Sequence, residues 1–192
     1  MTTQPTPPPE TTRVVPATGP TGPQSAVPVP DGVDQLRLRV PDRRAELWIV
    51  GAHGGAGESS LAALDPLWAE AGHAWPAAAS NERLAAIVVA RSNVRGLTAA
   101  QAAARQWATR MVPRVQLFGL VVIADAPGRL PKPLRDLSRV VAGGYPRSWT
   151  LPWIESWRLG EPIAIETAPR EVSNLVKDLN TLLYPGADGA TR

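Results

Sequence analysis

Residues 46–60 read ELWIVGAHGGAGESS. The apolar run at 46–50 is typical of a buried strand, and a glycine-rich turn follows it directly. The next residues, LAALDPLWAEAG, predict a helix over about 59–70. A strand, a glycine turn and a helix in this order are the local unit from which parallel α/β domains are built.

The rest of the chain continues this alternation of apolar runs and helical patterns. Because parallel strands are buried on both faces, they read as continuous apolar runs. We therefore predict an α/β domain of three layers with a mostly parallel sheet. Strands are predicted at 83–91 and 116–127, short extended pieces within 73–79 and 148–153, and helices at 98–111 (with Thr98 as N-cap), 130–144 and 169–184.

Composition divides the chain into three parts. Nine of the 21 prolines lie in the first 31 residues, which lack apolar periodicity. Such a segment buries too little surface to offset its ordering entropy, so we expect residues 1–35 to form a disordered leader. It has no apolar stretch like that of a signal peptide. Residues 36–184 are expected to form the domain, and 185–192 a frayed tail.

Residue counts exclude several classes of function. The chain has no cysteine and two histidines, which excludes disulfides and argues against a zinc site. No apolar run approaches the roughly 18 residues that a membrane helix requires. We therefore expect a cytoplasmic protein without a transmembrane segment, and the leading prediction includes no metal and no cofactor.

We call residues 53–60 the glycine loop: His53, Gly54, Gly55, Ala56, Gly57, Glu58, Ser59 and Ser60. Set against the P-loop pattern G-x-x-x-x-G-K-[ST], Glu58 stands at the lysine position and Ser59 at the magnesium-binding hydroxyl. The loop resembles the KGGVGKT variant of the MinD/ParA-like deviant Walker ATPases, a group of P-loop NTPases of the SIMIBI type. It keeps the glycines and the hydroxyl but loses both lysines, at His53 and Glu58.

The resemblance continues along residues 45–165. AIVVARSNVRGLTAAQAA (86–103), GLVVIADAPG (119–128) and AGGYPRSWTLPWIESWRLGEPI (142–163) look like successive segments of that family. It implies a P-loop NTPase-like fold and a context in partitioning, positioning, conjugation or secretion. The family's Walker B strand, which ends in D-x-P-P or D-x-P-G, has no counterpart within 71–82. Asp125 in ADAPG matches it, so Asp125 is either that displaced acid or part of a later strand.

A carboxylate at the lysine position opposes phosphate binding. Two unit charges about 4 Å apart interact by roughly 4 kcal/mol at an effective dielectric of 20, and replacing attraction by repulsion doubles the change. Without nucleotide, the same carboxylate is favourable in the first turn of a helix. Our hypothesis is that Glu58 is an internal anion that fills, or points away from, an emptied phosphate site. The alternative is a solvated side chain on a turn.

Other candidate residues lie on the same predicted rim, at the carboxyl ends of the strands. Arg91, Arg95 and Arg129 could bind an anion together; alternatively, one of them pairs with Asp125 or Glu58 and the others are solvated. Asp125 either serves a metal or belongs to ordinary Asp-Ala-Pro-Gly turn chemistry. Trp149, Trp153 and Trp157 form either a partner surface or a seal over the edge of the sheet.

The leading prediction is a protein without catalysis: a MinD/ParA-like accessory or scaffold protein with impaired nucleotide binding that binds a protein partner, with a homodimer as a further option. The first alternative is a noncanonical ATPase or GTPase that uses ATP and magnesium through Ser59 and Asp125. The second is a nucleic-acid binder. Residues 83–158 hold twelve Lys and Arg and three acids, a balance of +9 against +3 for the chain, although these charges also suit solvated helix faces.

Overall fold

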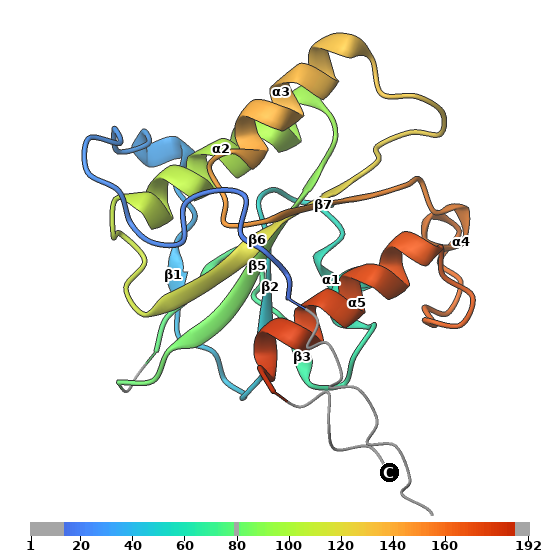
Figure 1. Ribbon diagram of the computed structural model, residues 1–192, viewed down its shortest axis with the longest axis horizontal. Helices are drawn as coiled ribbons and strands as arrows, with labels where there is room; N and C mark the ends of the chain where they lie inside the picture. The colour runs from blue at the N-terminus through green and yellow to red at the C-terminus, as the bar shows by residue number, and fades with distance from the viewer. Residues whose placement is uncertain (1–13, 79–80, 187–192) are drawn as a thin grey trace, which may run out of the picture.

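The computed structural model describes residues 14–78 and 81–186 (Figure 1). Its strands are β1 (Leu38–Arg39), β2 (Leu47–Gly51), β3 (Trp68–Glu70), β4 (Trp75–Pro76), β5 (Leu84–Arg91), β6 (Val115–Ile123) and β7 (Ser148–Leu151). Its helices are α1 (Glu58–Ala62), α2 (Val94–Ala108), α3 (Lys132–Ala142), α4 (Glu155–Arg158) and α5 (Arg170–Leu183), with a 3-10 turn at Gly32–Asp34.

Five strands form one sheet in the order β3-β2-β5-β6-β7, and every neighbouring pair is parallel. The predicted α/β domain with a mostly parallel sheet is therefore confirmed. Counted along the chain within this sheet, the order is 2-1-3-4-5, a doubly wound arrangement. β1 and β4 pair separately, so the ambiguous stretch at 73–79 does contain a short strand.

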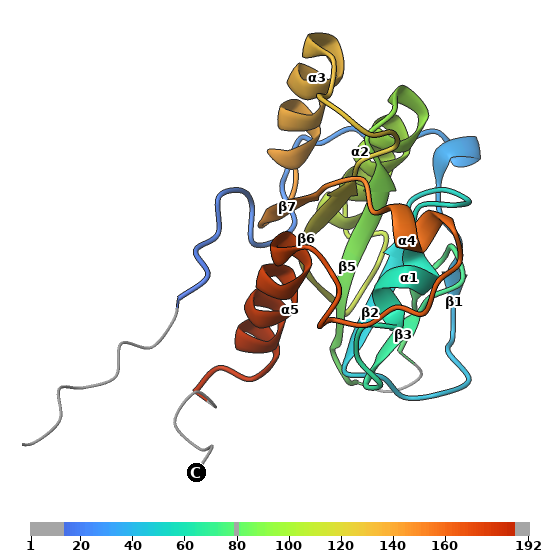
Figure 2. The same ribbon diagram turned by 90° about the vertical axis from the view of Figure 1, so that its right-hand side faces the viewer.

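Helices cover both faces of this sheet (Figure 2). Alternate residues of β2 serve the two faces: Trp48 and Val50 pack on the side of α2, and Leu47 and Ile49 pack on the side of α1 and α5. All four are buried because β2 lies inside the sheet. The amphipathic α5 contributes Val172, Leu175, Val176 and Leu179 to the second side as predicted, with Leu182 and Leu183 partly buried beside them.

The predicted helix over 59–70 is wrong in its second half. α1 ends at Ala62, and residues 68–70 form strand β3 beside β2. Pro66 lacks an amide hydrogen and cannot continue a helix. Asp65 Oδ1 instead accepts a hydrogen bond from the Leu67 N–H at 2.8 Å, which turns the chain. β3 brings an acid, Glu70, to the carboxyl end of a strand next to β2.

The start of α2 and the end of β6 also differ from the predictions. α2 begins at Val94, and its N-cap is Asn93, whose side chain accepts from the Gly96 N–H at 2.7 Å, rather than Thr98. Asparagine is a strong N-cap because its short side chain reaches this orphan donor. β6 ends at Ile123, because the Asp-Ala-Pro-Gly segment turns away from the sheet.

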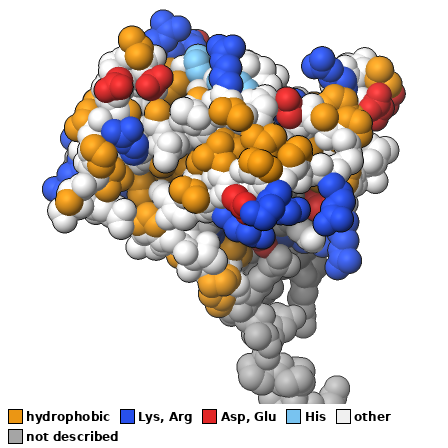
Figure 3. Space-filling model, turned by 90° about the horizontal axis from the view of Figure 1, so that it is seen from above, with side chains coloured by type: hydrophobic (Ala, Val, Ile, Leu, Met, Phe, Trp, Pro, Cys, Tyr) orange, Lys and Arg blue, Asp and Glu red, His pale blue; other side chains and the backbone are white. Residues whose placement is uncertain are grey.

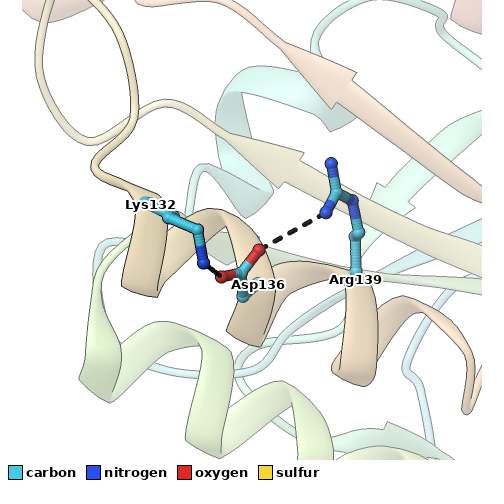
Figure 4. A network of polar contacts seen from close by, with 3 residues as sticks. All are labelled: Lys132, Asp136 and Arg139. Atoms are coloured by element: carbon cyan, nitrogen blue, oxygen red, sulfur yellow. Dashed lines mark hydrogen bonds and ion pairs between the residues drawn. The ribbon is translucent and has the colours of Figure 1, made fainter.

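Three charged side chains of α3, Lys132, Asp136 and Arg139, form a small network of ion pairs (Figure 4). Asp136 accepts from Lys132 at 2.8 Å and from Arg139 at 3.3 Å. The two basic side chains are 79% and 73% exposed, so water screens both ion pairs. Each stabilises the helix by about 0–1 kcal/mol, and this cluster has the character of a solvated helix face.

The described part of the predicted leader lies against the domain rather than apart from it. Arg147 Nε donates to the Val15 carbonyl at 2.9 Å, and Arg105 donates to the carbonyls of Pro28 and Val29, both at 2.8 Å. These carbonyls lie outside any helix or strand, so arginines of the domain can bind them. The remainder of the leader, 1–13, and most of the predicted tail, 187–192, lie outside the described residues.

Candidate functional site

The glycine loop lies at the point where the winding of the sheet reverses. β2 leads through the loop and α1 to β3 on one side, whereas β5, the neighbour of β2 on the other side, leads through α2 to β6. Ligands of open parallel sheets bind beyond the carboxyl ends of the strands at such a reversal. The loop therefore occupies the topologically favoured place for a ligand.

Two glycines give the loop its path. Gly55 and Gly57 have φ angles of 76° and 104°, in the left-handed region that glycine adopts without strain. A Cβ on Gly57 would also lie 2.7 Å from Cδ1 of Ile123 in β6. The loop thus passes close to the end of β6, two strands away from β2, before α1 begins.

Glu58 turns toward the segment that follows β3. Its Oε1 accepts from the Ala71 N–H at 2.9 Å, and its Oε2 accepts from the His73 N–H at 3.2 Å. Behind it, a Cβ on Gly51 would lie 2.8 Å from Oε2, so glycine at the end of β2 makes room for the carboxylate. Glu58 is therefore half-buried, and its carboxylate is hydrogen-bonded to backbone N–H groups.

The two histidines join the loop to neighbouring segments. His53 Nε2 accepts from the Arg91 N–H at 3.0 Å, which leaves the proton on Nδ1, 2.9 Å from the Gly54 carbonyl. His73 Nδ1 lies 2.7 Å from the Gly51 carbonyl. Both imidazoles bind main-chain groups, and nothing in this geometry pairs them with a nucleophile.

Arg91, at the end of β5, ties the loop to the end of β6. Its Nε donates to the Gly55 carbonyl and its Nη1 to the Ala124 carbonyl, both at 3.2 Å. Burial lowers the pKa of this guanidinium; nearby Asp125 acts against that shift and nearby Arg158 adds to it. Arginine remains charged despite such a shift. The Arg91 guanidinium binds backbone oxygens here, so among the three predicted arginines it is not the one that pairs with Asp125 or Glu58.

Beside Arg91, a cavity of about 240 Å³ opens between the loop, the end of β6 and α4. We call it the rim cavity. Asp125 and Arg158 supply exposed charges, and Trp153 and Trp157 supply half-buried aromatic walls. Its lining consists of Gly55, Arg91, Ile123, Asp125, Trp153, Ile154, Trp157 and Arg158.

Other predicted site residues are separated from this cavity. Ser59 lines a different groove of about 410 Å³, together with Arg43 and Glu70, so the fold does not bring Ser59 and Asp125 into one pocket. Arg95 and Arg129 are exposed and do not line the rim cavity. Ser60 lies in the first turn of α1.

The three predicted tryptophans also divide into two groups. Trp149 packs over Gly119 of β6, where a Cβ would lie 2.6 Å from its ring, and its indole N–H donates to Asp178 at 3.0 Å. It seals the sheet against α5. Trp153 and Trp157 line the rim cavity instead, and the indole N–H of Trp153 donates to Glu155.

Three residues of this region are not indicated by the sequence patterns: His73, Glu70 and Arg158. His73 and Glu70 follow a helix end that the apolar pattern predicts too late, and a turn signal at Asp65-Pro66 marks the correct end. No local sequence pattern marks Arg158 as a site residue, apart from its position directly after Trp157. Its place at the cavity depends on α4 folding back toward the loop.

On one face of the molecule (Figure 3), the basic side chains do not gather into a single patch. Figure 3 shows the face seen from above, where Lys and Arg side chains stand in separate groups among hydrophobic and uncharged ones. Within the described residues, no cluster of three His, Asp or Glu side chains suits a metal ion. None of the helices in that part of the chain combines the length and apolar character that crossing a membrane requires.

The chain belongs to the family of unknown function DUF6668, whose model matches residues 45–177. The match begins just before β2 and ends within α5, so it includes the glycine loop and the rim cavity. Comparisons with curated proteins and with solved structures find no match.

Proposed function

We propose that this protein is a MinD/ParA-like accessory protein with impaired nucleotide binding, which acts by binding a protein partner. One observation carries the proposal: the carboxylate at the lysine position is held by the N–H groups of Ala71 and His73. No cation from this position reaches a phosphate at the loop. The helix after the loop has five residues, so few peptide dipoles align to favour an anion there.

Calorimetry of the full chain with ATP and with GTP, each with magnesium, tests this proposal. We expect no binding in the micromolar range. Glu58→Gln, which removes the charge and keeps an acceptor oxygen, is expected to strengthen any residual nucleotide binding, whereas Ser59→Ala leaves it unchanged. Micromolar affinity of the natural chain for either nucleotide would contradict the proposal.

Nucleotide hydrolysis is the second candidate, and one observation favours it. Ser59 shares its groove with Glu70 and Arg43, and Glu70 ends the strand next to β2. A hydroxyl and a carboxylate in one groove are ligands that suit hydrated magnesium. Phosphate release from ATP that disappears in both Ser59→Ala and Glu70→Gln would support this candidate over the first.

A further inference from the structure

The rim cavity differs from the glycine loop because several of its side-chain donors have no partner among the described residues. Within the described part of the chain, the Arg158 guanidinium, the Arg91 Nη2 and the Trp157 indole N–H make no hydrogen bonds. Polar groups that fold into a cavity without partners remain available to bind a ligand. The cavity therefore offers several donors in one place.

The charge of the cavity selects the kind of anion. Arg91 and Arg158 contribute two positive charges and Asp125 one negative charge, so the lining carries a net charge of +1. The two guanidiniums repel each other until an anion lies between them. A single carboxylate balances this net charge of +1, whereas a phosphate dianion would leave an excess negative charge beside Asp125. Guanidinium groups bind carboxylates through paired hydrogen bonds.

The walls and the size of the cavity select the rest of the ligand. Trp153 and Trp157 offer aromatic surface, and Ile123 and Ile154 close the apolar side. Aromatic rings pack on one another in offset or edge-to-face contacts. The volume of about 240 Å³ is below the roughly 300–1,000 Å³ of pockets for drug-sized ligands. One ring with one short acidic group fits it better than a nucleotide does.

We propose that the rim cavity binds an aromatic carboxylate: a planar ring attached to a single carboxylate, with the acid held by Arg158 and Arg91 and the ring against Trp153 and Trp157. This inference rests on the proposed function, because it names the chemistry by which a partner is recognised. Two sources supply that chemistry, the carboxyl-terminal aromatic residue of a partner chain and a free aromatic acid.

An NMR titration of the full chain, observed at the tryptophan indole N–H signals, tests the inference. Trp153→Phe and Trp157→Phe assign the two signals of the cavity. The probes are phenylacetate, the peptide acetyl-Gly-Gly-Phe with a free carboxylate, the same peptide as an amide, and inorganic phosphate. We expect phenylacetate and the free peptide to shift both signals, and the amide to bind at least about tenfold more weakly.

Substitutions at the rim distinguish binding in the cavity from a nonspecific effect of positive surface charge. Arg158→Gln is expected to weaken binding about tenfold, the size expected for losing one charge-assisted hydrogen bond. The matched control Arg95→Gln removes the same charge outside the cavity and leaves binding unchanged. Asp125→Asn is expected to strengthen it several-fold, because a repulsive charge is removed.

The relative affinities of the probes distinguish the two sources of the ligand and also test the inference itself. Peptide affinity well above that of phenylacetate supports a partner chain as the source, and equal affinity supports a free acid. Absence of both signal shifts, phosphate binding as tight as that of phenylacetate, or an unchanged affinity in Arg158→Gln would overturn the inference. Because none of the carboxylate probes contains phosphate, this result is independent of the nucleotide calorimetry that tests the proposed function.

Discussion

At the β2 end of the sheet rim, Glu58, His53 and His73 use their polar atoms to bind backbone groups of neighbouring segments. At the β6 end, the Arg158 guanidinium and the Trp157 indole N–H line a cavity and make no hydrogen bonds within the described residues. Both ends lie at the carboxyl edge of one parallel sheet, where ligands usually bind. The difference indicates that the first group maintains the fold and the second is free to bind a ligand.

The largest expected effect is at Glu58. Glu58→Lys places a cation where the His73 N–H and the Ala71 N–H, which also donates to the Ile49 carbonyl, now find a carboxylate. The free energy of unfolding should therefore fall by about 2–3 kcal/mol, as for other hydrogen bonds to charged groups. Urea unfolding of the full chain measures this change. The free energy of unfolding should fall less in Glu58→Gln than in Glu58→Lys. If Glu58→Lys were as stable as the natural chain, Glu58 would not maintain the fold.

The next effect is at Gly51, whose missing side chain makes room for the Glu58 carboxylate. Gly51→Ala should cost about 1–2 kcal/mol, because the added Cβ lies 2.8 Å from Oε2. Gly54→Ala is the matched control, since a Cβ there meets no atom within 4 Å. In a double-mutant cycle with Glu58→Ala, the cost of Gly51→Ala should disappear. Additive effects would show that the two residues do not interact.

Tyr145 lies away from the rim and serves for comparison, because its buried hydroxyl group has a hydrogen-bond partner. Its hydroxyl donates to the Ala100 carbonyl at 2.6 Å, and burial raises the pKa of the phenol. The folded state therefore holds this proton more tightly than the unfolded chain, whose tyrosine titrates near about pH 10. Its stabilising contribution is complete below that pH and is lost as the pH rises further.

Tyr145→Phe should consequently cost about 1 kcal/mol at pH 8, where the hydrogen bond is present. The difference in unfolding free energy between the variant and the natural chain should narrow above about pH 10. Urea unfolding at both pH values measures the change. A constant difference would mean that Tyr145 is not protected as its burial indicates.

The smallest expected effects are in the rim cavity. Arg158→Gln and Asp125→Asn should each change the unfolding free energy by less than about 0.5 kcal/mol, because both side chains are exposed and lack hydrogen bonds to the rest of the described chain. The same urea measurements test this. A loss of stability comparable to that of Glu58→Lys would show that the cavity residues also maintain the fold, and the two ends would then not differ in role.

The elements that the sequence predicts well are those with local signals. The apolar runs of β2, β5 and β6 and the amphipathic pattern of α5 can be recognised from the order of the residues alone. β3 cannot be recognised from the sequence in this way. Trp68 is buried because β3 pairs with β2, and the local pattern of residues 59–70 gives no sign of that pairing. The glycine loop is likewise evident in the sequence, but the direction of Glu58 depends on residues 71–73, which fold beside it.

By itself, the sequence determined an α/β domain with a parallel sheet and a glycine turn that carries an acid where a phosphate loop carries lysine, because buried runs, glycines and charges act over a few residues. Only the tertiary structure decided the strand order, the commitment of Glu58 to the backbone and the assembly of Arg91, Asp125 and Arg158 around one cavity. These features join segments far apart in the chain, and strand pairing and side-chain packing, rather than local preference, bring them together.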